Sequence, residues 1–153
     1  MTGKELLIFL LIIVSMSSIS IVEAAQSGQD GYSVSEDWWR IGQDSKYTYS
    51  SYHIWMYWLL LPLLIIALPI AVADFSWRLL WLLIMSYIIG TVVEDFLWYI
   101  ANPKVTLKRF NPRETYWQKW FVLGPIAIPW HYIIKITAAI TIWVIAFQIY
   151  QLQ

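Results

Sequence analysis

Four long runs of apolar residues constrain the fold of this chain more than any other feature. They cover about residues 6–22, 54–73, 77–101 and 130–150, and few charged side chains interrupt them. A helix needs about 20 apolar residues to cross roughly 30 Å of hydrocarbon, and several of the runs reach that length. The short alternating strands that are typical of membrane barrels do not occur. The sequence therefore predicts an all-α integral membrane helical bundle.

Composition supports the membrane class and narrows the chemistry. Of the 153 residues, 59% are hydrophobic and only 13% are charged, whereas a soluble domain has about a quarter of its residues charged. The formal net charge is zero, so there is no electrostatic basis for binding a nucleic acid. Cysteine is absent, which excludes disulfides, iron–sulfur clusters and thiolate metal sites. Any metal would need His, Asp or Glu ligands.

The first apolar run carries the marks of a targeting segment. Lys4 precedes it, and the small residues Ala24 and Ala25 follow it. A basic N-terminal residue, a short apolar stretch and small residues at its C-terminal end are typical of a secretory signal peptide. We predict that residues 1–25 are either a cleaved signal peptide or a retained anchor helix. Residues 26–53 are polar and slightly acidic, and we expect them to form an extracytoplasmic segment.

The rest of the chain, residues 54–153, is predicted to form the membrane helical domain. Its expected helices cover residues 54–73, 77–101 and 130–150, and the tight connection between the first two makes them an antiparallel hairpin. Pro62 and Pro69 interrupt the first helix, so we expect kinks there that neighbouring helices repair.

A further apolar piece, residues 120–128, is broken by Gly124-Pro125. We expect an interfacial or re-entrant piece there. The alternative is that it forms the first part of one long kinked helix.

Two signals for orientation disagree. A cytoplasmic Lys4 places both long connections, residues 26–53 and 104–119, on the outer face. The second connection is basic, and the positive-inside rule would hold it in the cytoplasm. We give more weight to the signal-like N-terminus and to the acidic first connection. The protein is therefore expected in the cell membrane, with both long connections extracytoplasmic.

Ionisable residues inside the predicted membrane helices are the main candidates for chemistry. Glu94 and Asp95 lie roughly 10–12 Å inward from the helix end at 1.5 Å per residue, a depth at which carboxylates need a partner or water. His131 and Lys135 are four residues apart and share a helix face. Because antiparallel helices bring these ends to one membrane face, we predict a buried polar cluster of Glu94, Asp95, His131 and Lys135. His53 lies on the same side.

Four interpretations of this cluster stay open. The first is an ion pair between Lys135 and Glu94 or Asp95. The second is a metal site with Glu94, Asp95, His131 and His53 as ligands, which would suit copper, iron, zinc or manganese. The third is proton or ion handling by the buried acids. The fourth is binding of a lipid headgroup between the basic connection and the aromatic residues at the span ends.

The stretch Glu94-Asp95-Phe96-Leu97-Trp98-Tyr99 followed by Asn102-Pro103 carries a family resemblance, with Phe110, Trp117, Trp120 and Gly124-Pro125 further on. It resembles small uncharacterised multi-pass membrane proteins of archaea and bacteria with a Glu-Asp-x-Leu-Trp-aromatic and Asn-Pro signature. The resemblance covers about a third of the chain and implies that Glu94, Asp95, Trp98, Asn102 and Pro103 act as a unit. The pattern has a His close to Trp117, where this chain has Tyr116 and Gln118.

These features predict a non-catalytic accessory subunit of a larger membrane enzyme complex of the energy-converting or oxidising type. Small size and the lack of a cofactor-binding motif favour it. One alternative is a membrane metalloenzyme with a carboxylate and His site at the outer leaflet, and another is a component of ion or proton translocation. The expected partners are the lipid bilayer and other membrane protein subunits. Whether the chain has an enzymatic activity stays open.

Overall fold

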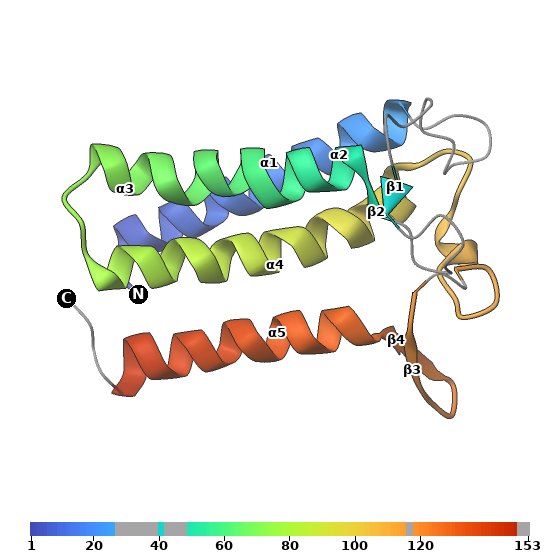
Figure 1. Cartoon of the computed structure of the whole chain (residues 1–153). Helices are drawn as coiled ribbons and strands as arrows, with labels where there is room; N and C mark the ends of the chain where they lie inside the picture. Colours follow the sequence, from blue (N-terminus) through green and yellow to red (C-terminus); the bar gives the residue numbers. More distant parts are fainter. Residues whose placement is uncertain (27–39, 42–48, 116–117, 150–153) are drawn as a thin grey trace.

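The computed structural model describes residues 1–26, 40–41, 49–115 and 118–149 and is mostly helical. Four helical segments are long and apolar enough to cross a membrane: Gly3–Gln26, Ser51–Val72, Trp77–Ala101 and Trp130–Ile149. They run alongside one another as a bundle (Figure 1). The expected helical architecture is therefore present, and the predicted signal or anchor region supplies its first helix, α1 (Gly3–Gln26).

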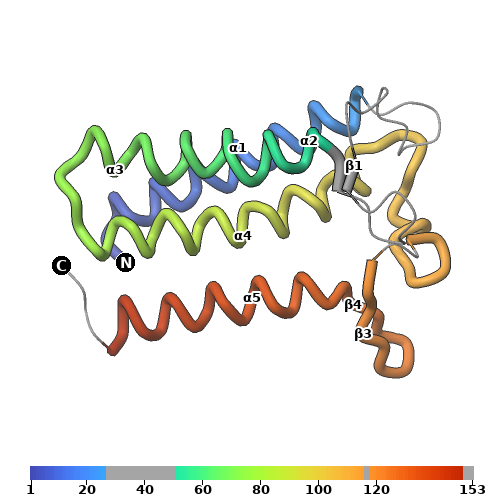
Figure 2. Tube along the Cα trace, in the orientation of Figure 1, coloured from blue at the N-terminus to red at the C-terminus, as the bar shows by residue number. Residues whose placement is uncertain are grey.

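The described elements that flank the two long connections lie at one end of the bundle (Figure 2). At that end α1 finishes, α2 (Ser51–His53) begins, and the connector of residues 102–119 leaves α4 (Trp77–Ala101). The turn between α3 (Leu68–Val72) and α4 lies at the opposite end. Most of the predicted polar segment 26–53 lies outside the described residues; within it, β1 (Arg40–Ile41) pairs with β2 (Tyr49–Ser50).

The second span keeps its helical path through both prolines by widening its turns. Its π-helical parts are η1 (Ile54–Leu60) and η2 (Leu63–Ala67). The Leu61 N–H donates to the carbonyl of Met56 rather than to that of Tyr57, and Pro62 has no N–H to offer. The Tyr57 carbonyl is satisfied instead by the hydroxyl of Tyr87 on α4. A neighbouring helix thus repairs the proline site, as apolar surroundings demand.

The closest helix packing joins α1 to α4. Every fourth residue of α1, beginning at Ile12 and including Met16 and Ser20, is buried. Met16 lies against Gly90, where an added Cβ would come within 2.7 Å of the Met16 Cγ. Small residues of this kind let the backbones of membrane helices approach. The close neighbour of α4 at Gly90 is therefore α1.

Both ends of α4 are fixed by polar side chains. At its start the Ser76 hydroxyl caps the helix by accepting a hydrogen bond of 3.0 Å from the Leu79 N–H, as expected for a serine in this position. At its end the buried Asn102 accepts bonds from the N–H groups of Lys104 and Val105, at 2.9 and 3.1 Å. Asn102 therefore stops the helix and sets the direction in which the connector leaves.

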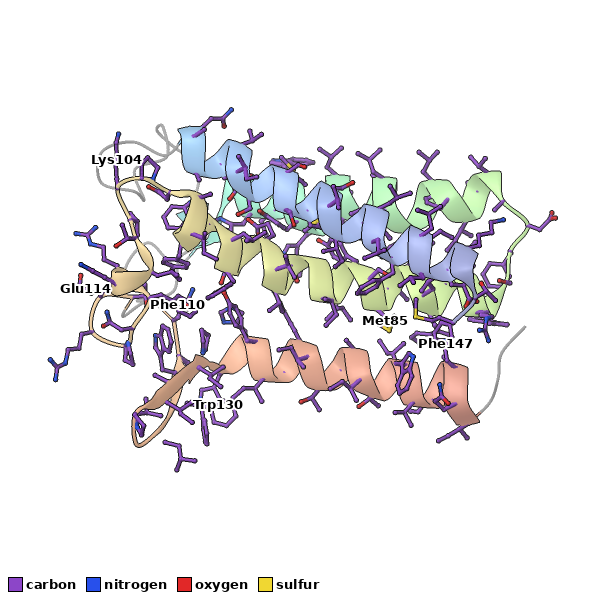
Figure 3. The ribbon with its side chains drawn as sticks, turned by 180° about the vertical axis from the view of Figure 1, so that it is seen from behind. Met85, Lys104, Phe110, Glu114, Trp130 and Phe147 are labelled. Atoms are coloured by element: carbon purple, nitrogen blue, oxygen red, sulfur yellow. The ribbon has the colours of Figure 1, made fainter. Side chains whose placement is uncertain are left out.

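The last span, α5 (Trp130–Trp143) with η4 (Val144–Ile149), packs along α4. Ala139 and Phe147 are buried there against Leu82 and Met85, and Figure 3 shows Met85 and Phe147 on the facing sides of the two helices. At the same end, Arg78 of α4 pairs with Glu5 of α1 and lies 4.8 Å from the centre of the Phe147 ring. The Arg78 side chain of α4 therefore contacts both α1 and the last span.

Residues 120–128 do not extend the last helix, which was the alternative considered for them. They lie in an antiparallel hairpin of β3 (Trp120–Leu123) and β4 (Ile126–Pro129). Gly124 occupies the first turn position with φ of 58°, a conformation that type II′ hairpin turns assign to glycine. Pro125 lacks an N–H and cannot continue a helix. The run therefore folds back on itself before α5 begins.

The Gly90 contact yields a stability prediction. Gly90→Leu places a side chain into the space of Met16, and overpacking of this kind costs about 1–3 kcal/mol. We expect the free energy of unfolding in detergent to fall by that amount. Gly3 has no atom within 4 Å of an added Cβ, so Gly3→Leu is the matched control and should leave stability unchanged. Equal effects of both variants would contradict the packing described.

Candidate functional site

Two polar clusters lie inside the bundle near the end that carries the long connections. The first, the Glu23 cluster, consists of Glu23, Tyr52, Tyr57 and Glu94. The Glu23 carboxylate, at the end of α1, accepts hydrogen bonds from the Tyr52 hydroxyl and, at 2.8 Å, from the Tyr57 hydroxyl. Both tyrosines come from the first two turns of the second span, so this cluster joins α1 to that span.

Glu94 completes the Glu23 cluster from α4. Glu94 is only 6% exposed and lies close enough to Glu23 and Tyr57 to interact with them electrostatically. The hydroxyls of Tyr52 and Tyr57 thus bind the Glu23 carboxylate beside the buried Glu94. Carboxyl groups inside a membrane helix bundle need polar neighbours of this kind.

The second cluster, the Asp95 cluster, consists of Asp95, His131 and Tyr132 and joins α4 to α5. The Tyr132 hydroxyl donates to Asp95 Oδ2. His131 Nε2 lies 3.5 Å from the same oxygen. The side chains of His131 and Asp95 are partly exposed, at 37% and 35%. Because α5 begins with these residues, Asp95 fixes the start of α5 against α4.

Phe110 links the Asp95 cluster to the connector and to the hairpin. It follows the short 3-10 turn η3 (Leu107–Arg109). The centre of its ring lies 4.8 Å from that of Tyr99, 5.0 Å from that of Trp120 and 6.0 Å from that of Tyr132. Figure 3 shows Phe110 at the same end of the molecule as Lys104 and Glu114. The ring therefore holds the basic connector against the ends of α4, β3 and α5.

The four residues of the predicted cluster divide between two neighbourhoods. Adjacent positions on a helix point about 100° apart, so Glu94 faces α1 and Asp95 faces α5. Lys135 lies near enough to both carboxyls to be attracted by them, but it is not part of the ion pairs found among the described residues. The polar contact between α4 and α5 is made instead by His131 and Tyr132 with Asp95.

The proposed metal ligands are separated in the same way. His53 lies on the Glu23 side, with its ring centre 6.4 Å from that of Tyr57, whereas His131 lies beside Asp95. Within the described parts of the chain, no group of three or more His, Asp or Glu side chains is placed to hold one metal ion. The geometry therefore gives no support to a site that combines these four ligands.

Sequence reasoning did not identify Glu23 or the tyrosines of the two clusters as site residues, and it named Phe110 only as part of the family resemblance. Glu23 lay at the edge of the predicted signal region, where its position suggested a cleavage site and not a membrane helix. A usable signal was nevertheless present. Glu23, Tyr52 and Glu94 all fall close to the ends of their apolar runs on the same predicted membrane face, where a lone carboxylate seeks hydroxyl donors.

No family model, no curated protein and no solved structure matches this chain. The resemblance of the Glu94 to Pro103 stretch to small multi-pass membrane proteins therefore stays a prediction.

The partner assignments can be tested by two double-mutant cycles. For Asp95→Leu with Tyr132→Phe we expect a coupling free energy of about 0.6–1.7 kcal/mol, the size of hydrogen bonds between membrane helices. For Glu94→Gln with Lys135→Met we expect near-additive effects, because these side chains do not form a close pair. The measurement is the free energy of unfolding in detergent. Stronger coupling in the second cycle than in the first would contradict the geometry.

Proposed function

We propose that the protein is a non-catalytic subunit of a larger membrane complex, and that it binds its partner subunits through the β3–β4 hairpin. It is inserted as four membrane helices, with α1 retained in the mature chain. The observation that carries the proposal is the surface of the hairpin, which is apolar on both of its faces.

The hairpin offers an unusual amount of apolar side chain for a short loop. Val122 is 57% exposed and Leu123 65%, and three more residues have more than a third of their surface exposed: Phe121, Ile126 and Ile128. An exposed apolar patch on a protein surface is typical of a site that binds another protein or a membrane. The rest of the described chain contacts the hairpin at its base: Pro129 is buried, the Trp120 ring packs on Phe110 and the Phe121 ring packs on Trp130.

Backbone chemistry favours a protein partner over lipid for the tip of the hairpin. In the described chain β3 and β4 pair only with each other, so each strand has an outer edge of unpaired N–H and C=O groups. Such edges readily pair with another chain, and they are not tolerated in contact with hydrocarbon. Water would form hydrogen bonds with the strand edges but would leave the apolar side chains exposed. A partner subunit can both pair with the edges and cover the apolar side chains.

The retention of α1 is supported by its contacts. Met16 fills the space at Gly90, and Glu23 binds two tyrosine hydroxyls of the second span. Removal of residues 1–25 would leave Glu94 facing lipid without its carboxyl neighbour, which is costly for an ionisable group. A signal peptide has no need of such contacts, whereas a permanent helix depends on them.

We also propose that both long connections are extracytoplasmic. The support is the positive charge of Lys4 at the start of α1 and the common end of the bundle at which the described elements that flank the two connections lie (Figure 2). The paired Glu5 and Arg78 at the same end as Lys4 add little net charge.

Orientation is open to a clean test because the chain has no cysteine. Two exposed residues are suitable places for a single cysteine: Glu114, which Figure 3 shows at the same end as Lys104, and Asp74, in the turn between α3 and α4 at the other end. In intact cells, an impermeant thiol reagent should label Glu114→Cys but not Asp74→Cys. The reverse pattern would overturn the proposed orientation without affecting the four-helix arrangement.

The subunit proposal predicts the behaviour of a hairpin variant. After extraction in a mild detergent, the wild-type protein should migrate with other polypeptides at a mass well above 18.0 kDa. Leu123→Asp should reduce that association by at least about tenfold, because a buried unpaired carboxylate in an apolar interface costs several kcal/mol. The measurement is the fraction of the chain recovered in the large complex on a native gel.

The matched control is Val72→Asp, which adds the same charge at a residue that is 80% exposed at the opposite end of the bundle. It should leave the complex intact. A wild-type protein that migrates alone, or a Leu123→Asp variant that assembles as well as the control, would overturn the proposal.

A further inference from the structure

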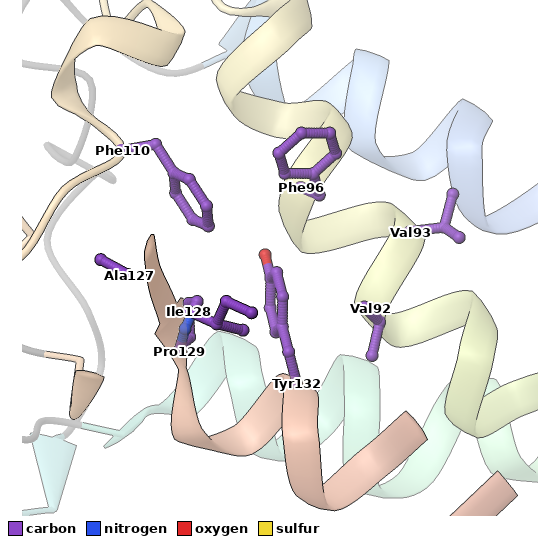
Figure 4. A pocket seen from close by; sticks show the side chains of 8 residues that line it. All are labelled: Val92, Val93, Phe96, Phe110, Ala127, Ile128, Pro129 and Tyr132. Carbon is purple, nitrogen blue, oxygen red and sulfur yellow. The ribbon is translucent and has the colours of Figure 1, made fainter. Parts of the chain in front are cut away.

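A narrow apolar groove lies between α4, the base of the hairpin and the start of α5 (Figure 4). It is lined by Val92, Val93, Phe96, Phe110, Ala127, Ile128, Pro129 and Tyr132. Its volume is about 280 Å³, just below the roughly 300–1,000 Å³ of sites that enclose a whole small molecule. The groove is therefore suited to part of a chain-like apolar ligand and not to a complete one.

The groove lies at the end of α4 that leads into the connector. Val92, Val93 and Phe96 line it from within the span, and Phe110 closes it from the connector side. The Phe96 and Phe110 rings meet edge to face with their centres 5.6 Å apart. One end of the groove thus faces the hydrocarbon region and the other faces the level at which lipid headgroups lie.

The headgroup side of the groove carries positive charge. Lys108 and Arg109 immediately precede Phe110, and the connector from residue 104 to residue 119 holds five basic residues against one acid. Lys108 and Arg109 are exposed. Arg109 and Glu114 are 3.9 Å apart and both about half exposed, an arrangement that contributes little energy in solvent. Because Lys108 and Arg109 directly precede Phe110, which lines the groove, their backbone lies beside its headgroup side.

We propose that this groove binds one acyl chain of an anionic phospholipid, while Lys108 and Arg109 bind its phosphate. The apolar lining selects a hydrocarbon chain, and the positive connector selects an anionic headgroup over a zwitterionic one. A bound protein segment would account for the apolar groove but not for the positive side chains beside it. The proposal goes beyond the subunit role: it requires insertion in a bilayer but not the presence of other subunits.

Lipid titration followed by native mass spectrometry tests the headgroup. The purified full chain should bind phosphatidylglycerol more tightly than phosphatidylcholine with the same acyl chains. Lys108→Gln should weaken phosphatidylglycerol binding roughly fivefold, the effect of one basic residue near an anionic lipid surface. Lys4→Gln, at an exposed lysine of the opposite end, should not change it. Equal binding of both lipids, or equal loss in both variants, would overturn the proposal.

A photo-crosslink tests the occupant of the groove. Benzoylphenylalanine in place of Phe96, a groove residue that is 37% exposed, should give an adduct with the mass of one phospholipid when the protein is irradiated in phosphatidylglycerol vesicles. The same probe in place of Phe75, at the opposite end of the bundle, should give a weaker lipid adduct that does not depend on headgroup charge. An adduct to a second protein chain, or to another part of this chain, would overturn the lipid assignment.

Discussion

The contact between α1 and α4 at Gly90 is the interaction on which the other features depend. Because Gly90 has no side chain, Met16 and the α1 backbone come close to α4. This close packing brings Glu23 near Glu94 and near the tyrosines of the second span. A bulkier residue at position 90 would move α1 outward and leave these carboxyls without their neighbours. The polar chemistry of the membrane interior is thus a consequence of one small residue.

The three helices after residue 53 and their order could be predicted from sequence because they depend on local properties, whereas residues 1–25 were left open between a cleaved signal peptide and a retained helix. Run length, proline position and the Asn102-Pro103 stop are sufficient to place the ends of the spans within a few residues. The common face of the two long connections follows from the number of crossings alone. Even the repair of the Pro62 site by a neighbouring helix follows from the need to satisfy backbone groups in an apolar medium.

Partner choice could not be predicted in the same way, because it depends on how the helices rotate against one another. Glu94 and Asp95 are neighbours in sequence, yet they face different helices, so a single cluster becomes two. The β3–β4 hairpin was not predicted for a different reason. Two four-residue apolar strands separated by Gly124-Pro125 are a recognisable hairpin pattern, but their place between membrane helices favoured an interfacial or re-entrant interpretation without strands.

The central claim is that α1 is a permanent part of the fold, and the mass of the mature chain tests it most directly. The protein should be extracted from the membranes of cells that produce it and its intact mass determined. We predict a chain that retains Glu23, with a mass close to 18.0 kDa. A mature chain that begins at Ala25 or Gln26 would contradict the account, because it would lack both Met16 and the Glu23 carboxylate that binds Tyr52 and Tyr57.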